Sequence, residues 1–152
     1  MSDVLAKPAL KRGVVPPRLD DPYADEHTQP FWDKALQGVL SCTSCRNCNT
    51  KILPPQPRCF VCQSKDFDWV DLPGTGTIYT FTVVRHPLSE QFAEVVPYIT
   101  AVIELDGTQG AGARMQLNVV NCDVEKVRIG DKVRIFFDKV TDTYAMPRAE
   151  PA

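Results

Sequence analysis

The fold of this chain is decided by one stretch of sequence, CRNCNTKILPPQPRCFVC at residues 45–62. It contains two Cys-x2-Cys pairs separated by ten residues. Each pair forms a tight turn whose two thiolates reach one ion, and two such turns supply four sulfurs at tetrahedral corners, about 2.3 Å from a zinc ion. The spacing therefore predicts that Cys45, Cys48, Cys59 and Cys62 bind one structural Zn²⁺ ion.

Cys42 offers a second way to choose the ligands, because Cys42 and Cys45 also form a Cys-x2-Cys pair. We favour Cys45 and Cys48, since they leave the shorter span to Cys59. Iron in a rubredoxin-like site remains chemically open, because softness alone does not separate iron from zinc in a four-thiolate set. Cys122 has no partner nearby in the sequence and is interpreted as a small buried side chain.

The metal is expected to be structural. A catalytic zinc keeps one open coordination position and usually has histidine or carboxylate among its ligands. The two histidines, His27 and His86, lie outside the cysteine motifs. Residues 41–65 hold few apolar side chains, so metal binding, worth on the order of 10 kcal/mol in isolated peptides, would supply the folding free energy of this zinc ribbon.

Residues 1–30 contain five prolines, which exclude a continuous helix or a central strand. We interpret them as an extended arm. A short helix is expected within residues 31–40, with Pro30 at its start and Gly38 near its end. Phe31 and Trp32 would be costly to expose, so the helix should dock on its own domain or on a partner, which makes the pair a candidate partner contact.

The pattern changes to strands in residues 66–148. Alternating or β-branched segments end at turns such as Gly74-Thr75-Gly76 and Gly130-Asp131. The expected strands are 77–85, 98–105, 113–119, 132–138 and a short one near 143–146. Five strands without a long helix between them predict a mainly β protein with a C-terminal OB-fold barrel. A small β-sandwich is the structural alternative.

Composition limits the function classes. The chain has 43% hydrophobic and 24% charged residues, no apolar run of the roughly 20 residues that span a bilayer, and no recognisable leader segment. We expect a cytoplasmic protein without membrane contact. Its net charge of −2 argues against nucleic-acid binding, which usually needs a basic excess. The sequence lacks the common nucleophile, phosphate-loop, metalloprotease and dinucleotide motifs, so we predict no catalytic residue.

Two binding functions remain as alternatives. Arg85 and His86 at a strand end, together with Lys132 and Arg134, could meet the phosphates of an acyl-CoA ester. Single-stranded nucleic-acid binding would need a basic groove interleaved with aromatic side chains. Tyr79 and Phe81 alternate as that function requires, but they could equally face the barrel core.

The order of motifs along the chain resembles a known family of bacterial and archaeal proteins with an N-terminal helix, a rubredoxin-like zinc ribbon and a C-terminal OB-fold. The resemblance covers roughly residues 28–148. The matching segments are Phe31-Trp32, the two cysteine pairs, Pro54-Pro55, Trp69, residues 74–82, Pro97-Tyr98 and residues 127–130. The spacing from Trp32 to Cys45 is also similar, which favours Cys45 over Cys42 as the first ligand.

The resemblance implies a function that the motifs alone do not. Family members accompany thiolase-fold or ketoacyl-synthase-like enzymes, and one similar protein is the accessory subunit of the acetyltransferase that makes diacetylphloroglucinol, a secondary metabolite. It implies a non-catalytic scaffold in an acyltransferase complex that bridges thiolase-fold subunits and helps an acyl group or CoA pass between them. Two positions depart from the family pattern, since Asn49 and Gln63 stand where glycine is common. Asn tolerates a left-handed backbone, whereas Gln63 suggests a slightly different second turn.

Overall fold

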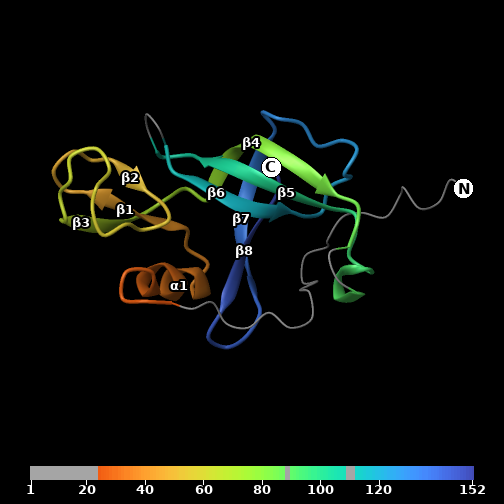
Figure 1. Cartoon of the computed structure of the whole chain (residues 1–152), viewed down its shortest axis with the longest axis horizontal. Helices are drawn as coiled ribbons and strands as arrows, with labels where there is room; N and C mark the ends of the chain where they lie inside the picture. Colours follow the sequence, from red (N-terminus) through yellow and green to blue (C-terminus); the bar gives the residue numbers. More distant parts are fainter. Residues whose placement is uncertain (1–23, 88–89, 109–111) are drawn as a thin grey trace, which may run out of the picture.

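The structure is a computed structural model that describes residues 24–87, 90–108 and 112–152. In these residues the chain forms one α-helix, a three-stranded sheet and a closed five-stranded barrel. The elements, in chain order, are α1 (Gln29–Leu36), β1 (Ser41–Cys45), β2 (Lys51–Ile52), β3 (Phe67–Asp71), β4 (Thr75–Val84), the 3-10 helix η1 (Glu90–Phe92), β5 (Tyr98–Leu105), β6 (Arg114–Val119), β7 (Lys132–Lys139) and β8 (Ala145–Pro151). Figure 1 shows the small sheet beside the barrel, with α1 near their junction. The mainly β fold class predicted from the sequence is confirmed.

Helix α1 docks on its own chain. Pro30 lies in its first turn, and Gly38 follows its end with a φ of 77°, a left-handed conformation that suits glycine. The Phe31 ring meets the Phe137 ring at 6.4 Å and is only 5% exposed. Trp32, which is half-buried, meets the Tyr144 ring at 5.2 Å. The sequence left open whether this helix docks on its own domain or on a partner. In the structure it docks on its own domain, where Phe31 is covered.

The three-stranded sheet has the order β2-β1-β3 and forms the ribbon. The predicted division at residue 65 gave residues 66–71 to the barrel, whereas β3 pairs with β1 along its whole length. The ribbon therefore extends to Asp71. Strand β1 is buried throughout although it reads Ser-Cys-Thr-Ser-Cys, and the Thr43 hydroxyl donates a hydrogen bond to the Ile52 carbonyl at 2.9 Å.

The barrel closes in the order β4-β5-β6-β8-β7, and β7 pairs back onto β4. The pairing of β6 with β8 is parallel and the other pairings are antiparallel. This is the Greek-key strand arrangement of a five-stranded OB-fold barrel. Alternate residues of β5, from Ile99 to Leu105, are buried as predicted, and so are Leu117 and Val119 of β6.

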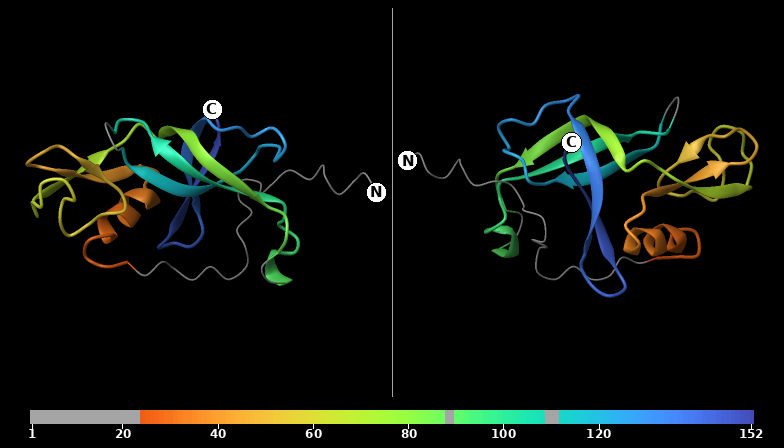
Figure 2. Two further views of the ribbon diagram at one scale, coloured as in Figure 1. Left: turned by 45° about the horizontal axis from the view of Figure 1, so that its top comes forward. Right: turned by 180° about the vertical axis from the view of Figure 1, so that it is seen from behind.

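Two details of the barrel were not expected. Strand β8 begins at Ala145 and runs to Pro151, longer than the short strand predicted near residues 143–146. It carries Arg148, which is fully buried and whose Nε lies 3.2 Å from a carboxylate oxygen of Asp138 in β7. The two views in Figure 2 show the β7–β8 hairpin reaching out of the barrel alongside α1. The extended arm predicted for residues 1–30 lies outside the described residues as far as residue 23.

Candidate metal centre

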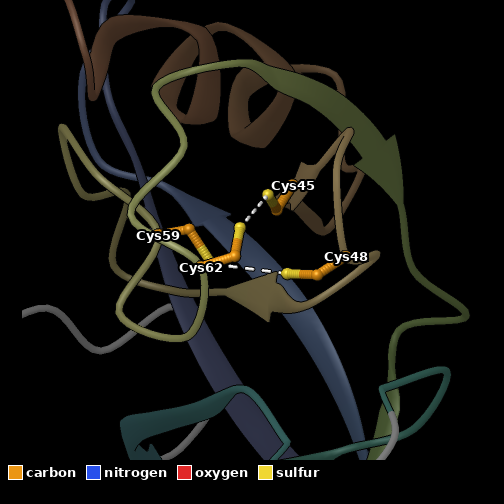
Figure 3. A group of neighbouring side chains, drawn as sticks. All are labelled: Cys45, Cys48, Cys59 and Cys62. Atoms are coloured by element: carbon orange, nitrogen blue, oxygen red, sulfur yellow. Dashed lines mark hydrogen bonds between the residues drawn. The ribbon is translucent and has the colours of Figure 1, made fainter.

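The four predicted cysteines come together at the end of the ribbon that is remote from the barrel. Their Sγ atoms all lie within 4.8 Å of one another, and this is the one such group of potential metal ligands in the described ranges. Figure 3 shows the side chains converging from β1 and from the loops that follow it. The Cys45–Cys62 and Cys48–Cys59 sulfur separations are both 3.5 Å. Sulfurs bound tetrahedrally to zinc lie about 3.8 Å apart, so the arrangement fits one metal ion.

Two equivalent turns present these sulfurs. In the first turn, the Asn49 amide donates to the Cys45 carbonyl at 2.8 Å, and the Cys45 amide donates to the Thr50 carbonyl at 3.0 Å. In the second, the Gln63 amide donates to the Cys59 carbonyl at 2.9 Å, and the Cys59 amide to the Ser64 carbonyl, also at 2.9 Å. The two turns are thus bonded in the same way.

The residues that close the two turns also share one backbone conformation. Asn49 has a φ of 61° and Gln63 a φ of 62°. Glycine is common at such positions because they require a left-handed backbone conformation. A residue with a side chain adopts this conformation at a cost of roughly 1 kcal/mol or more. The expectation that Gln63 signals a different second turn is wrong. The backbone of the second turn has the same conformation as that of the first, and Gln63 adopts the left-handed conformation that glycine usually fills.

The metal-free thiols differ in acidity. Burial raises the pKa of Cys45 to about 11. The Thr50 hydroxyl, whose oxygen lies 3.1 Å from the Cys48 sulfur, lowers the pKa of Cys48, and a hydrogen bond from Asn47 lowers the pKa of Cys62. Groups that stabilise a thiolate also orient it as a ligand. Metal binding must displace the remaining thiol protons.

The spare cysteines stay apart from this site. Cys42 is fully buried in β1 and lies outside the four-sulfur group. Cys122 is partly buried, rather than fully buried, and its Sγ lies 3.7 Å from the Asp123 carbonyl. His27 and His86 are both exposed and lie outside the four-sulfur group.

The four candidate phosphate ligands are not brought together. Arg85 and His86 follow one end of β4, whereas Lys132 and Arg134 pair with Thr77 and Thr75 at its other end. Arg85 lies eight positions beyond Thr77, a distance of roughly 26 Å along an extended strand. Arg85 is paired with Glu125, Arg134 with Glu150, and Lys132 donates to the Thr77 hydroxyl at 2.7 Å. These side chains do not form one phosphate site.

An apolar groove lies elsewhere, where α1, the ribbon and β6 meet. It measures about 200 Å³. Three segments line it: Thr28, Phe31 and Trp32 of the helix region, Leu53, Pro54 and Pro55 of the ribbon, and Arg114, Met115 and Gln116 of β6. The Arg114 guanidinium lies 3.7 Å from the centre of the Tyr79 ring and 3.3 Å from a Glu104 carboxylate oxygen.

Sequence reasoning missed this groove because its walls come from three distant segments. The only signals were Pro54-Pro55 and Trp32 within the family pattern. The two aromatic residues considered for nucleic-acid stacking do not form one exposed surface. Tyr79 is exposed and lies beneath Arg114, whereas Phe81 packs against the barrel core.

The fold and the four-cysteine site together define a class of protein: a zinc-ribbon-like module joined to an OB-fold barrel. Residues 69–138 match the model of the ChsH2 C-terminal OB-fold domain. A DUF35 domain-containing scaffold protein of Methanocaldococcus jannaschii is 35% identical over 99 residues, which are 64% of this chain and 67% of that protein. The chain belongs to this DUF35 family.

Two further relatives extend the comparison. The solved structure described as the Ltp2-ChsH2(DUF35) aldolase superposes with a TM-score of 0.74 at 30% identity, covering 86% of this chain and 98% of that chain. A probable enoyl-CoA hydratase alpha subunit of Thermomonospora curvata is 33% identical over 123 residues, 80% of this chain. The chain spans only 37% of the length of that relative. No helix among the described residues is long and apolar enough to cross a membrane.

Proposed function

We propose that this chain is a non-catalytic accessory subunit of a thiolase-like acyltransferase complex, in which it bridges or stabilises thiolase-fold or ketoacyl-synthase-like subunits. The observation that carries the proposal is the closed four-cysteine site. Four protein sulfurs would fill the tetrahedral shell of a zinc ion, so no position remains for a reacting water or substrate. The ion then holds the ribbon in shape and takes no part in a reaction.

The relatives support the same role. The DUF35 protein of Methanocaldococcus jannaschii is described as a scaffold protein. The ChsH2(DUF35) structure is described together with Ltp2 as an aldolase. These descriptions match a subunit that supports the chemistry of another chain. The partner of this chain is expected to carry the catalytic residues.

The test is coexpression with a thiolase-fold protein from the same organism. We expect the two chains to copurify, and the acyl-transfer activity of the partner to rise when this chain is present. A partner that is fully active alone and never retains this chain would contradict the proposal. Metal analysis of the same preparation, with zinc expected at one ion per chain, tests the cofactor.

A second candidate function is binding of an acyl-CoA ester. The observation that favours it is the apolar groove, and not the four cationic side chains, which lie too far apart to form one site. The groove offers aromatic, proline and methionine side chains for an acyl chain, with Arg114 and Gln116 at its polar side. Arg114 would meet a carbonyl or phosphate oxygen. Calorimetric titration with acetyl-CoA and with a long-chain acyl-CoA tests this function. A gain in affinity with chain length that is lost in Met115→Asp supports groove binding, whereas no heat with either ester rejects it.

A further inference from the structure

The second metal turn carries two large apolar side chains at its tip. Phe60 is 58% exposed and Val61 is 60% exposed, although each is flanked by a metal-ligand cysteine. Burying such side chains contributes roughly 1.5–3 kcal/mol each. Two adjacent apolar residues that the chain itself leaves uncovered therefore point to burial by another molecule.

The first metal turn shows that the backbone does not require these residues. It has the same hydrogen bonds and the same left-handed closing residue, yet its tip is Arg46-Asn47. The equivalent positions are thus polar in one turn and apolar in the other. The metal cannot explain the difference, because both turns would bind the same ion. The apolar tip of the second turn needs an explanation outside the ribbon.

The charges around the two tips differ as well. Arg46 is neutralised by Asp68, to which its Nε donates at 2.9 Å. Arg58 and Lys65, which flank the second turn, are exposed, and neither forms an ion pair with a carboxylate of the described residues. The second turn therefore presents an apolar centre flanked by two cations that form no ion pair within the described residues.

The position of the turn suits contact with a separate molecule. Cys45 pairs with Phe67 at the metal end of the ribbon, and Ser41 pairs with Asp71 at the end next to the barrel. Figure 1 shows the metal end reaching away from the barrel. A metal-held turn keeps one shape before and after binding, so little conformational entropy is lost when a partner covers it.

We infer that the tip of the second turn, Phe60 and Val61 with Arg58 and Lys65 at its rim, is the peg by which this chain docks on its partner enzyme subunit. The inference rests on the proposed function. The complementary surface is an apolar pocket on the partner with carboxylates at its edge. Two side chains are too small an area for a stable interface of about 800 Å² per side, so they serve as the anchor of a larger contact.

Two other occupants fit the charges less well. A symmetric dimer of this chain would place the same patch on both sides, so Arg58 and Lys65 of the two copies would face like charges. An anionic membrane would also attract the rim cations, but two cations contribute only about 2 kcal/mol at such a surface, whereas segments that recognise anionic lipids carry clusters of about four to eight. A partner protein with its own carboxylates avoids both problems.

The test measures affinity of the full-length, metal-loaded chain for the coexpressed thiolase-fold subunit, with the double variant Phe60→Ser, Val61→Ser. We expect the Kd to rise at least about 30-fold, the effect of truncating one interface hot-spot residue. The charge-reversal variant Arg58→Glu, Lys65→Glu should also weaken binding and should reverse its dependence on salt. Metal content and thermal unfolding of each variant show that the ribbon is retained.

The matched control is Ile129→Ser, which removes another exposed apolar side chain, 67% exposed, from a barrel turn. Its affinity should equal that of the wild type. Failure of the wild type to bind the thiolase-fold subunit would overturn the proposed function, and the docking peg with it. Wild-type binding that the double variant leaves unchanged would overturn the peg alone. Self-association, measured by light scattering, or vesicle flotation that depends on Phe60 and Val61 would also overturn it.

Discussion

The ribbon and the barrel differ in what stabilises each of them. The barrel has a continuous apolar core, with Ile99 and Ile103 of β5 fully buried among neighbouring strands. The buried apolar cluster of the ribbon contains Ile52 and the ligand cysteines, with Phe67 packed beside them. A barrel of this kind is stabilised by apolar burial, whereas the ribbon would depend on the metal ion that its four cysteines could hold. A change at one source of stability should therefore leave the other region folded.

Removing one metal ligand is expected to have the largest effect. Cys59→Ser replaces one of four thiolates, so the ribbon should lose most of a metal-coupled folding free energy on the order of 10 kcal/mol. The barrel should keep its strands, because its core does not use the metal. Backbone amide NMR spectra should show residues 41–71 collapsing to the unfolded region while barrel signals stay dispersed. Simultaneous loss of all β-structure would contradict separate stabilisation.

The converse change tests the barrel. A Cβ added at Gly76 would lie 2.6 Å from the Glu104 carbonyl oxygen and 2.6 Å from a methyl of Ile103, and the backbone oxygen cannot move aside. Gly76→Ala should therefore destabilise the barrel by about 1–3 kcal/mol. Denaturant unfolding followed by the backbone amide NMR signals of β5 and β6 should show the loss, while metal content stays at the wild-type level. Gly130→Ala, at an open position, is the control for added volume, although its φ of 93° adds backbone strain.

Acidification should weaken metal binding by the ribbon. Burial holds the pKa of the metal-free Cys45 thiol at about 11, above its ordinary value, so this thiol is protonated at neutral pH. Metal binding must displace that proton, and affinity therefore falls as pH falls. For each proton displaced, the metal Kd should rise roughly tenfold per unit decrease in pH. Competition with a chromophoric chelator across pH measures the slope, and a pH-independent Kd would contradict this reading.

The smallest expected effect is an increase in the stability of the ribbon. Gln63→Gly removes a side chain from the left-handed conformation and should stabilise the metal-loaded ribbon by up to about 1 kcal/mol. Asn49→Gly should gain less, because Asn tolerates this region better than Gln does. Hydrogen exchange of ribbon amides measures both changes. A loss of protection in Gln63→Gly would show that the Gln63 side chain makes a contact that outweighs the strain.

The features that the sequence predicted well are those with a short-range pattern. The cysteine spacing picked out four side chains whose sulfurs lie close together, and the alternation of Arg114, Gln116 and Asn118 with apolar residues located β6 and its buried face. Strand β1 was missed because its Ser and Thr side chains give no apolar alternation, although all five residues are buried. Pairing with β2 and β3 makes it a strand.

Longer-range features could not be read from the sequence. The four side chains predicted to meet phosphates lie in two pairs at opposite ends of β4. This placement follows from the register of β7 on β4, which the sequence does not reveal. Strand β8 was predicted too short because Pro147, Arg148 and Pro151 are poor strand signals, and the buried pairing of Arg148 with Asp138 depends on the neighbouring strand. The groove at Trp32 likewise exists only where three segments meet.

The central claim is that this chain works as an accessory subunit. It is tested most directly by the molar mass of the complex formed with a purified thiolase-fold subunit, measured by light scattering after size-exclusion chromatography. We predict one species that contains both chains and whose partner has higher acyl-transfer activity than the partner alone. Two separate peaks, with partner activity unchanged by an excess of the metal-loaded chain, would contradict the account.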